Sequence, residues 1–236
     1  MAEVRRFRNR AQAGKLLAKA LGAYARQPGA IVLALPRGGV PVAFAVAMTL
    51  GLELDILLVR KLGLPRQPEY AIGAIGSGGV RVLQPGVPGL MGVTQEQVDA
   101  IAAREQMEIE RRTRLYRGGR APPALSGRSV IIVDDGIATG STMQAAVEVA
   151  RRHGAARVVV AAPVAPPDTL ETLAAQADEL VCLASPLHFR AVSQWYDSFD
   201  QTSDEEVQDL LAMAWRSQDD RQPNEQLHHP KGEDTT

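Results

Sequence analysis

The sequence has little cysteine and few aromatic residues. Cys182 is the single cysteine among 236 residues, so an intramolecular disulfide is impossible, and no cysteine–histidine cluster has zinc-site spacing. We interpret Cys182, in the apolar run 180–183, as a small buried hydrophobic residue. Aromatic residues make up 4% of the chain. Ala, Val and Leu must therefore supply most of the core, which suits helices packed closely on a parallel sheet.

The sequence also lacks an excess of one charge and long apolar runs. It has 26 Lys and Arg against 27 Asp and Glu, so we expect no surface for nucleic acid or for an anionic membrane. No run approaches the roughly 18–20 apolar residues of a membrane span, and residues 1–15 lack the apolar stretch of a signal peptide. We expect a cytoplasmic protein. The short N-terminal basic cluster is interpreted as a solvated helix start; it consists of Arg5, Arg6, Arg8 and Arg10.

Apolar runs alternate with amphipathic helical patterns along most of the chain. This alternation is typical of α/β proteins in which helices flank a parallel sheet. With 236 residues, the chain is long enough for one such domain with an elaboration. The expected strands are 30–35, 54–59, 71–75, 80–83, 130–133, 157–164 and 180–183. Helices are expected near 16–24, at 41–50 and 95–116, before His153, after Asp168, where Asp168 and Glu171 could cap the helix, and after Ser203.

The middle of the chain departs from this alternation. Residues 63–70 contain two prolines and are expected to form a loop, and 84–92 and 118–126 are linkers. Thr94 and Gln97 form a capping box for the long helix, which is more charged than the other helices. Glu108 and Arg112 form an i,i+4 pair on it. We expect this helix to be an excursion packed on the edge of the domain.

The most informative segment runs from Val130 to Met143. It reads Val-Ile-Ile-Val-Asp-Asp-Gly-Ile-Ala-Thr-Gly-Ser-Thr-Met: a buried strand, two adjacent carboxylates, and a loop that opens a helix. The loop amides and the helix N-terminus suit a phosphate. Asp134 and Asp135 would repel that phosphate but can accept hydrogen bonds from sugar hydroxyls, so ribose 5-phosphate meets both demands.

Other interpretations of this segment are weaker. Each piece alone would fit a capped strand-to-helix turn with solvated acids, but their order at one strand end favours a ligand site. A Walker loop needs Lys before its Ser or Thr, whereas Gly140 precedes Ser141. No Gly-x-Gly-x-x-Gly motif opens a helix after a strand.

The segment resembles the phosphoribosyl pyrophosphate (PRPP) signature of type I phosphoribosyltransferases, and the resemblance spans roughly residues 11–200. Pro36-Arg37-Gly38-Gly39 resembles the family's pyrophosphate loop, in which a non-proline cis peptide is often found. Arg60-Lys61, placed at the end of the second core strand, resembles the basic residues that help to neutralise pyrophosphate. Residues 63–70 match the mobile hood over the active site.

The resemblance implies a type I phosphoribosyltransferase fold over residues 1–216, with a hood and an inserted helix at about 94–117. Residues 217–236 are polar and expected to be a disordered tail. Within that tail, His228 and His229 are interpreted as solvated residues.

The implied reaction transfers the phosphoribosyl group from PRPP to a nitrogenous base, as in nucleotide salvage. Mg²⁺ would arrive with PRPP, and the protein groups that could hold it are Asp134 and Asp135. Arg37, Lys61, Asp134 and Asp135 are implied to be catalytic. The implied substrate-binding set is Gly38, Gly39, Arg60, Gly136, Ile137, Ala138, Thr139, Gly140, Ser141, Thr142 and Trp195. Members commonly form homodimers, so a homodimer is expected.

One residue departs from part of the family. Enzymes that act on 6-oxopurines carry an acid at the position of Ala138, so hypoxanthine or guanine salvage by that mechanism is not expected. The adenine and orotate branches tolerate Ala there, but the sequence matches neither base-recognition signature. The acceptor is expected near 186–199, which holds His188, Phe189, Trp195 and Tyr196; a lid or dimer contact is the alternative for these aromatic residues.

Three functions fit these residues. The first is catalytic transfer from PRPP. The second is a PRPP-sensing regulator on the same fold without significant catalysis, because one fold can host several functions. The third is a hydrolase or phosphorylase that uses a related phosphoribosyl donor.

Overall fold

A parallel five-stranded sheet forms the centre of the computed structural model, which describes residues 6–64, 67–83, 86, 89 and 92–220. The strand order is β2-β1-β6-β7-β8, and every pairing is parallel. This confirms the expected fold class. The strands are β1 (Ala30–Ala34), β2 (Glu53–Ile56), β6 (Ser129–Val133), β7 (Arg157–Val164) and β8 (Glu179–Ala184).

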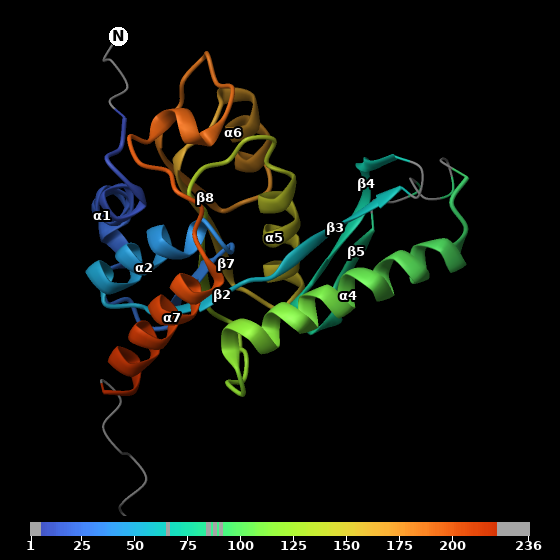
Figure 1. Ribbon diagram of the computed structural model, residues 1–236, viewed down its shortest axis with the longest axis horizontal. Coiled ribbons are helices and arrows are strands. Elements are labelled where there is room, and N and C mark those ends of the chain that lie inside the picture. The colour runs from blue at the N-terminus through green and yellow to red at the C-terminus, as the bar shows by residue number, and fades with distance from the viewer. Residues whose placement is uncertain (1–5, 65–66, 84–85, 87–88, 90–91, 221–236) are drawn as a thin grey trace, which may run out of the picture.

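Helices cover both faces of the sheet (Figure 1). On one face lie α1 (Arg10–Ala20), α2 (Gly39–Leu50) and α7 (Asp204–Asp219); on the other lie α5 (Ser141–Arg152) and α6 (Pro167–Ala174). Along β6, Ile131 and Val133 belong to the cluster beneath α2, whereas Val130 and Ile132 belong to the cluster beneath α5. Because both faces are covered, the strand needs an unbroken apolar run.

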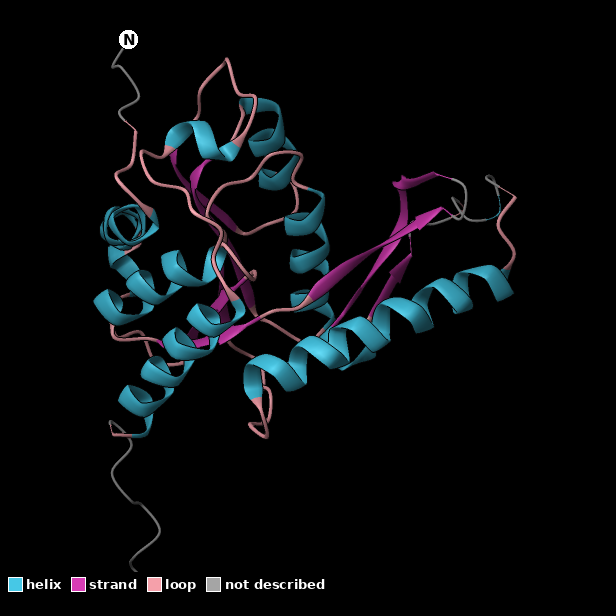
Figure 2. Cartoon of the chain, in the orientation of Figure 1, coloured by secondary structure: helices cyan, strands magenta, loops and turns pink. Residues whose placement is uncertain are grey.

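A second, antiparallel sheet projects from the core (Figure 2). Its strands include most of the segment 63–70 that was matched to the family's hood, so the whole sheet is called the hood below. It consists of β3 (Val59–Leu64), β4 (Gln67–Gly76) and β5 (Arg81–Leu83). The long helix α4 (Gln95–Arg117) runs along it and contributes the buried Val98, Ile101, Ala102 and Ile109. The expected excursion is therefore an α-helix packed on a small sheet of its own.

The expected strand at 54–59 is in fact two strands. β2 ends at Ile56 and β3 begins at Val59, so the chain leaves the central sheet between them. Leu57 and Leu58 are both buried at this crossing, and the Leu57 amide donates to the carbonyl of Ala34 over 2.9 Å. Because the apolar run continues from β2 into β3, the sequence does not indicate that the chain passes from one sheet to the other here.

The expected loop at 63–70 was also wrong in part. β3 continues to Leu64 and β4 begins at Gln67, and these two residues are paired. The two prolines predict a loop when they are considered alone. Pairing of β3 with the antiparallel β4 nevertheless supplies backbone hydrogen bonds that stabilise strands here. Residues 65 and 66 lie outside the described part.

The N-caps predicted from the sequence are present at α4 and α7 but not at α6. Thr94 and Gln97 form the predicted capping box, and the Ser203 hydroxyl accepts from the amide of Glu206. α6 begins after Pro166 without a side-chain cap, because Pro at the first helical position needs no amide partner.

α7 continues to Asp219, beyond the expected start of the tail. Short 3-10 turns lie at η1 (Gly22–Tyr24), η2 (Ser77–Gly79) and η3 (Val192–Trp195). Arg5, most of 84–92, the rest of the predicted tail and its two histidines lie outside the described residues. Within the described ranges, none of the helices combines the length and apolarity that crossing a membrane requires.

Candidate active site

Two loops meet at the carboxyl edge of the central sheet. β1 and β6 are parallel neighbours with Ala34 opposite Val133, so the residues that follow each strand emerge side by side. The Pro36–Arg37 peptide is cis, as the resemblance implied. A Cβ on Gly38 would overlap Oδ2 of Asp135, and one on Gly39 would lie 2.8 Å from the carbonyl oxygen of Val133. Glycine at both positions therefore allows the 36–39 loop to pack directly on Asp134 and Asp135, which we call the acid pair.

The acid pair lies in a desolvated environment. Asp135 is buried and Asp134 is half-buried, and the amide of Asp135 donates to Oδ1 of Asp134 over 2.8 Å. Desolvation, with a further contribution from the charge of Asp135, raises the pKa of Asp134 well above its usual value. Desolvation also raises the pKa of Asp135, and its hydrogen bond to Arg10 opposes that rise. Even with Arg10 beside it, the pair therefore resists carrying two full charges.

Arg10 is a site residue that the sequence did not identify. It was counted only in the N-terminal basic cluster, yet its Nε donates to Oδ2 of Asp135 over 2.7 Å. The two residues are 125 positions apart, so no local pattern links them. The Tyr196 hydroxyl, from the segment after β8, donates to the backbone carbonyl of Asp135 over 2.6 Å.

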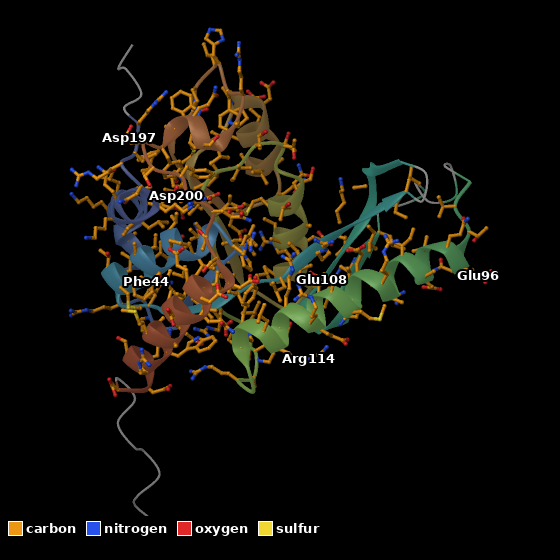
Figure 3. The ribbon with its side chains drawn as sticks, in the orientation of Figure 1. Phe44, Glu96, Glu108, Arg114, Asp197 and Asp200 are labelled. Carbon is orange, nitrogen blue, oxygen red and sulfur yellow. The ribbon has the colours of Figure 1, made fainter. Side chains whose placement is uncertain are left out.

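A cavity of about 480 Å³ opens in front of the acid pair. Pro36, Arg37 and Gly38 line one side of it, and Arg10 lines another. The segment after β8 completes the wall with Val192, Phe199, Gln201 and Thr202. We call this the acid-pair cavity. Figure 3 shows Asp197 and Asp200 on this segment beside α1.

The loop after the acids, residues 136–142, leads into α5. The buried Ile137 donates its amide to the carbonyl of Val164 over 2.9 Å, and the carbonyl of Ala138 accepts from Thr169 Oγ1 over 2.8 Å. These two bonds fix the loop against β7 and α6. Gly140 takes a left-handed φ of 77° just before the helix, which favours glycine there.

The hydroxyl groups of this loop face solvent at the start of α5. Thr139, Ser141 and Thr142 are exposed, and Thr139 Oγ1 lies 3.3 Å from Ser141 Oγ. Packing excludes a side chain at Gly136, because a Cβ there would lie 2.5 Å from Val192. The predicted phosphate loop thus presents donors beside the positive end of a helix dipole.

Arg37 lines the acid-pair cavity but also reaches the start of α7. Its Nη1 lies 3.6 Å from Oδ1 of Asp204, and the Tyr116 hydroxyl of α4 donates to the same oxygen over 2.6 Å. Asp204 therefore connects the 36–39 loop with the hood helix, a link that no local sequence pattern reveals.

Arg60 and Lys61 lie on the hood strand β3 rather than at the end of a core strand. Arg60 Nε is 2.9 Å from Oε2 of the largely buried Glu105 on α4. Lys61 lines a second cavity of about 370 Å³, between the hood and α5, together with Ser141 and Thr142. The structure thus places one predicted basic residue beside the acid pair and carries the other two on the hood.

Trp195 is outside the lining of the acid-pair cavity. It packs in a small cluster with Phe7 and Tyr196, and its carbonyl accepts from the Phe7 amide over 2.8 Å. Phe199 is the aromatic residue that lines the cavity. The sequence pointed to the segment 186–199 but could not say which aromatic ring faces the acids.

The match to known proteins agrees with this geometry. The family model described as the phosphoribosyl transferase domain matches residues 7–196. Two curated proteins of Mycobacterium tuberculosis, from strains CDC 1551 and H37Rv, are each 50% identical over 210 residues, and both are named provisionally as phosphoribosyl transferases. The match covers 89% of this chain and 47% of each relative, so the chain spans about half the length of these relatives.

A solved structure extends the comparison to the fold. The crystal structure of the protein TT1426 from Thermus thermophilus is 46% identical and superposes with a TM-score of 0.81, covering 88% of this chain and 98% of that one. The family match spans the 36–39 loop, the hood and the acid pair alike. The chain therefore belongs to the phosphoribosyl transferase domain family.

Proposed function

We propose that the protein transfers the 5-phosphoribosyl group of PRPP to a nitrogenous acceptor and releases pyrophosphate. The observation that carries this proposal is the placement of the acid pair between the 36–39 loop, which packs directly on it, and the hydroxyl-rich loop at 136–142. One ligand that spans these three features needs a terminal phosphate, neighbouring hydroxyl groups and a second anionic group. PRPP has all three in this order.

Each loop would bind one part of PRPP. The 136–142 loop and the start of α5 would hold the 5-phosphate, because exposed hydroxyls and helix amides favour an anion. Asp134 and Asp135 would accept hydrogen bonds from the ribose hydroxyls. Arg37 would leave Asp204 to contact the pyrophosphate, since a dianionic group is a stronger partner than one carboxylate at 3.6 Å.

The reaction would be a substitution at C1 of the ribose. The lone pair of the acceptor nitrogen forms the new bond to C1, the bond from C1 to pyrophosphate oxygen breaks, and pyrophosphate leaves with that electron pair. A nitrogen that carried a proton releases it to solvent. Positive charge develops on the ribose ring, as in glycoside chemistry. Arg37 and the hood residues Arg60 and Lys61 would stabilise the negative charge on the leaving group.

Magnesium fits this site only as a companion of the substrate. Among the described residues no group of three or more His, Cys, Asp or Glu side chains could hold a metal ion. Mg²⁺ retains several waters and binds through substrate phosphates with one or two carboxylates, a role open to Asp134 and Asp135. When bound, it would neutralise phosphate charge.

Calorimetry with PRPP tests the donor part of the proposal. Asp134→Asn keeps the shape of the side chain but replaces one acceptor oxygen by an NH₂ group, so PRPP should bind about 10- to 100-fold more weakly, because a hydrogen bond to a charged group is worth about 1.5–3 kcal/mol. Asp168→Asn, on the exposed start of α6, is the matched control and should bind normally. A wild-type protein that fails to bind PRPP contradicts the proposal.

Pyrophosphate release tests the acceptor part. The wild-type protein, PRPP and Mg²⁺ should release pyrophosphate with at least one base from a panel that includes adenine, orotate, hypoxanthine and guanine. Tight PRPP binding with no release across the panel would contradict catalysis and favour the PRPP-sensing alternative.

A further inference from the structure

The guanidinium of Arg10 is held by two distant parts of the chain. Its side chain and that of Asp135 are each 12% exposed. Nε donates to Oδ2 of Asp135, and Nη1 donates to the backbone carbonyl of Asp200, each over 2.7 Å. Cζ also lies 3.8 Å from the centre of the Phe199 ring, within the range of a cation–π contact.

Asp135 is fixed from the other directions as well. Gly38 packs against Oδ2, with no room for a Cβ. The Tyr196 hydroxyl holds the backbone carbonyl of Asp135. Arg10 is the positively charged partner of the Asp135 carboxylate, and its donor at 2.7 Å fixes the position of Oδ2, while Gly38 limits the space beside that oxygen.

The planar fork of Arg10 is suited to this task. One nitrogen binds Asp135 while another binds the segment after β8, so the orientation of the carboxylate depends on the wall of the cavity. Lysine would keep the charge but would not reproduce the two fixed donor directions. A neutral side chain would leave the adjacent carboxyl groups without their positive neighbour.

We propose that Arg10 is a positioning residue for the recognition of sugar hydroxyls: by holding Oδ2 of Asp135, it orients the acid pair towards a ribose in the acid-pair cavity. This inference rests on the proposed function. It assigns to the start of α1 a share in selecting ribose over a sugar that lacks a hydroxyl group, whereas the 136–142 loop recognises only the phosphate.

The test compares two sugar phosphates without metal. Calorimetry measures the dissociation constants of ribose 5-phosphate and 2-deoxyribose 5-phosphate, which differ by one hydroxyl. The wild-type protein should prefer ribose 5-phosphate by about tenfold, because an unpaired buried acceptor penalises the analogue. Arg10→Gln should reduce this ratio to about twofold or less, and Arg10→Lys should give an intermediate ratio. Arg8→Gln, an exposed neighbour at the same helix start, should keep the wild-type ratio.

The outcomes separate the inference from the function on which it rests. If Arg10 only anchors α1, Arg10→Gln lowers the melting temperature and leaves the ratio unchanged, which overturns the inference alone. A wild-type protein that binds both sugars equally also overturns it. A wild-type protein that binds neither overturns the proposed ribose phosphate site and the inference together.

A second variant covers the case in which Arg10→Gln does not fold. Phe199→Leu removes the ring beneath the guanidinium and leaves the partners of the ion pair in place. The preference of Phe199→Leu for ribose 5-phosphate over 2-deoxyribose 5-phosphate should be weaker than that of the wild type but should not disappear. Unchanged ratios in both Phe199→Leu and Arg10→Lys count against a positioning role.

Discussion

The central sheet and the hood bury their strands differently. Val130, Ile131, Ile132 and Val133 of β6 are all buried, because helices cover both faces. In β3 of the hood, Leu62 and Leu64 are buried while the neighbouring positions retain exposure. α4 covers one side of this sheet, and the cavity of about 370 Å³ lies between its other side and α5. α5 also packs against β3 and β4, but fewer strand positions are buried in β3 than in β6, so we expect the hood to be the part that opens at lower free energy.

The ion pairs of α4 also differ in burial between the surface of the hood and its junction with the central sheet. Glu108 on α4 pairs with Arg111 and Arg112 at the surface, where side chains are 29–57% exposed. The pair of Asp55 with Arg117, at the end of α4, joins the hood to the core strand β2 and is only 3% exposed on each side. The junction therefore depends on a buried charge pair, whereas the pairs of Glu108 are solvated.

The largest expected effect is at this junction. Arg117→Met should lower the free energy of unfolding by about 3–5 kcal/mol, because it leaves Asp55 buried without its positive partner. Burial already raises the pKa of Asp55, and Arg117 opposes that rise. Denaturant unfolding provides the measurement. Arg114→Met, on an exposed position of the same helix (Figure 3), is the control and should change little.

Equal losses in the two arginine variants would mean that the buried pair contributes nothing special to the junction. Combining Asp55→Leu with Arg117→Met should recover much of the loss, since a neutral pair of apolar side chains leaves no unpaired charge.

A matched pair of core truncations compares the two regions directly. Ile131→Ala in the central sheet should cost about 2–5 kcal/mol, the range for removing a fully buried Ile side chain. Ile101→Ala on α4 should cost less, because that residue keeps 8% exposure whereas Ile131 is fully buried. Urea titrations followed by circular dichroism measure both. A larger loss for Ile101→Ala would contradict the assignment of lower stability to the hood.

The N-cap of α4 should contribute about 1 kcal/mol. Thr94→Ala removes the hydroxyl that accepts from the Gln97 amide and breaks the capping box. Hydrogen exchange at the first turn of α4 should accelerate, with little change in the central sheet. Gln95→Ala, at the next exposed position, is the control and should stay within about 0.5 kcal/mol of wild type.

The smallest effect is expected at Glu108. Its hydrogen bonds to Arg111 and Arg112 lower its pKa from 4.5 to about 2, so any stability it contributes is present above pH 4.5 and is lost as the pH falls towards 2. The pairs are exposed, so the contribution should stay below about 1 kcal/mol. Thermal melts of Glu108→Gln and wild type should differ slightly at pH 7 and converge near pH 2. A difference that grows on acidification would contradict this sign.

Several features of the fold could be read from local sequence. The strands of the central sheet were predictable because burial on both faces demands unbroken apolar runs, as in Val130–Val133. The capping box at Thr94 was predictable because it is satisfied within one helical turn. In the hood, the strands expected at 71–75 and 80–83 are confirmed within β4 and β5. The first strand and the separate sheet were missed, because Leu57 and Leu58 continue an apolar run across two sheets and because the pairing of Leu64 with Gln67 is not a property of either residue alone.

The sequence by itself determined the strand, the two acids and the loop that opens α5, because strand burial and helix initiation are set by neighbouring residues. Tertiary structure alone decided that Arg10 holds Asp135, that Phe199 rather than Trp195 faces the cavity, and that Asp204 links Arg37 to Tyr116. These contacts join residues far apart in the chain, and only the packing of α1, α4 and α7 around the sheet brings them together.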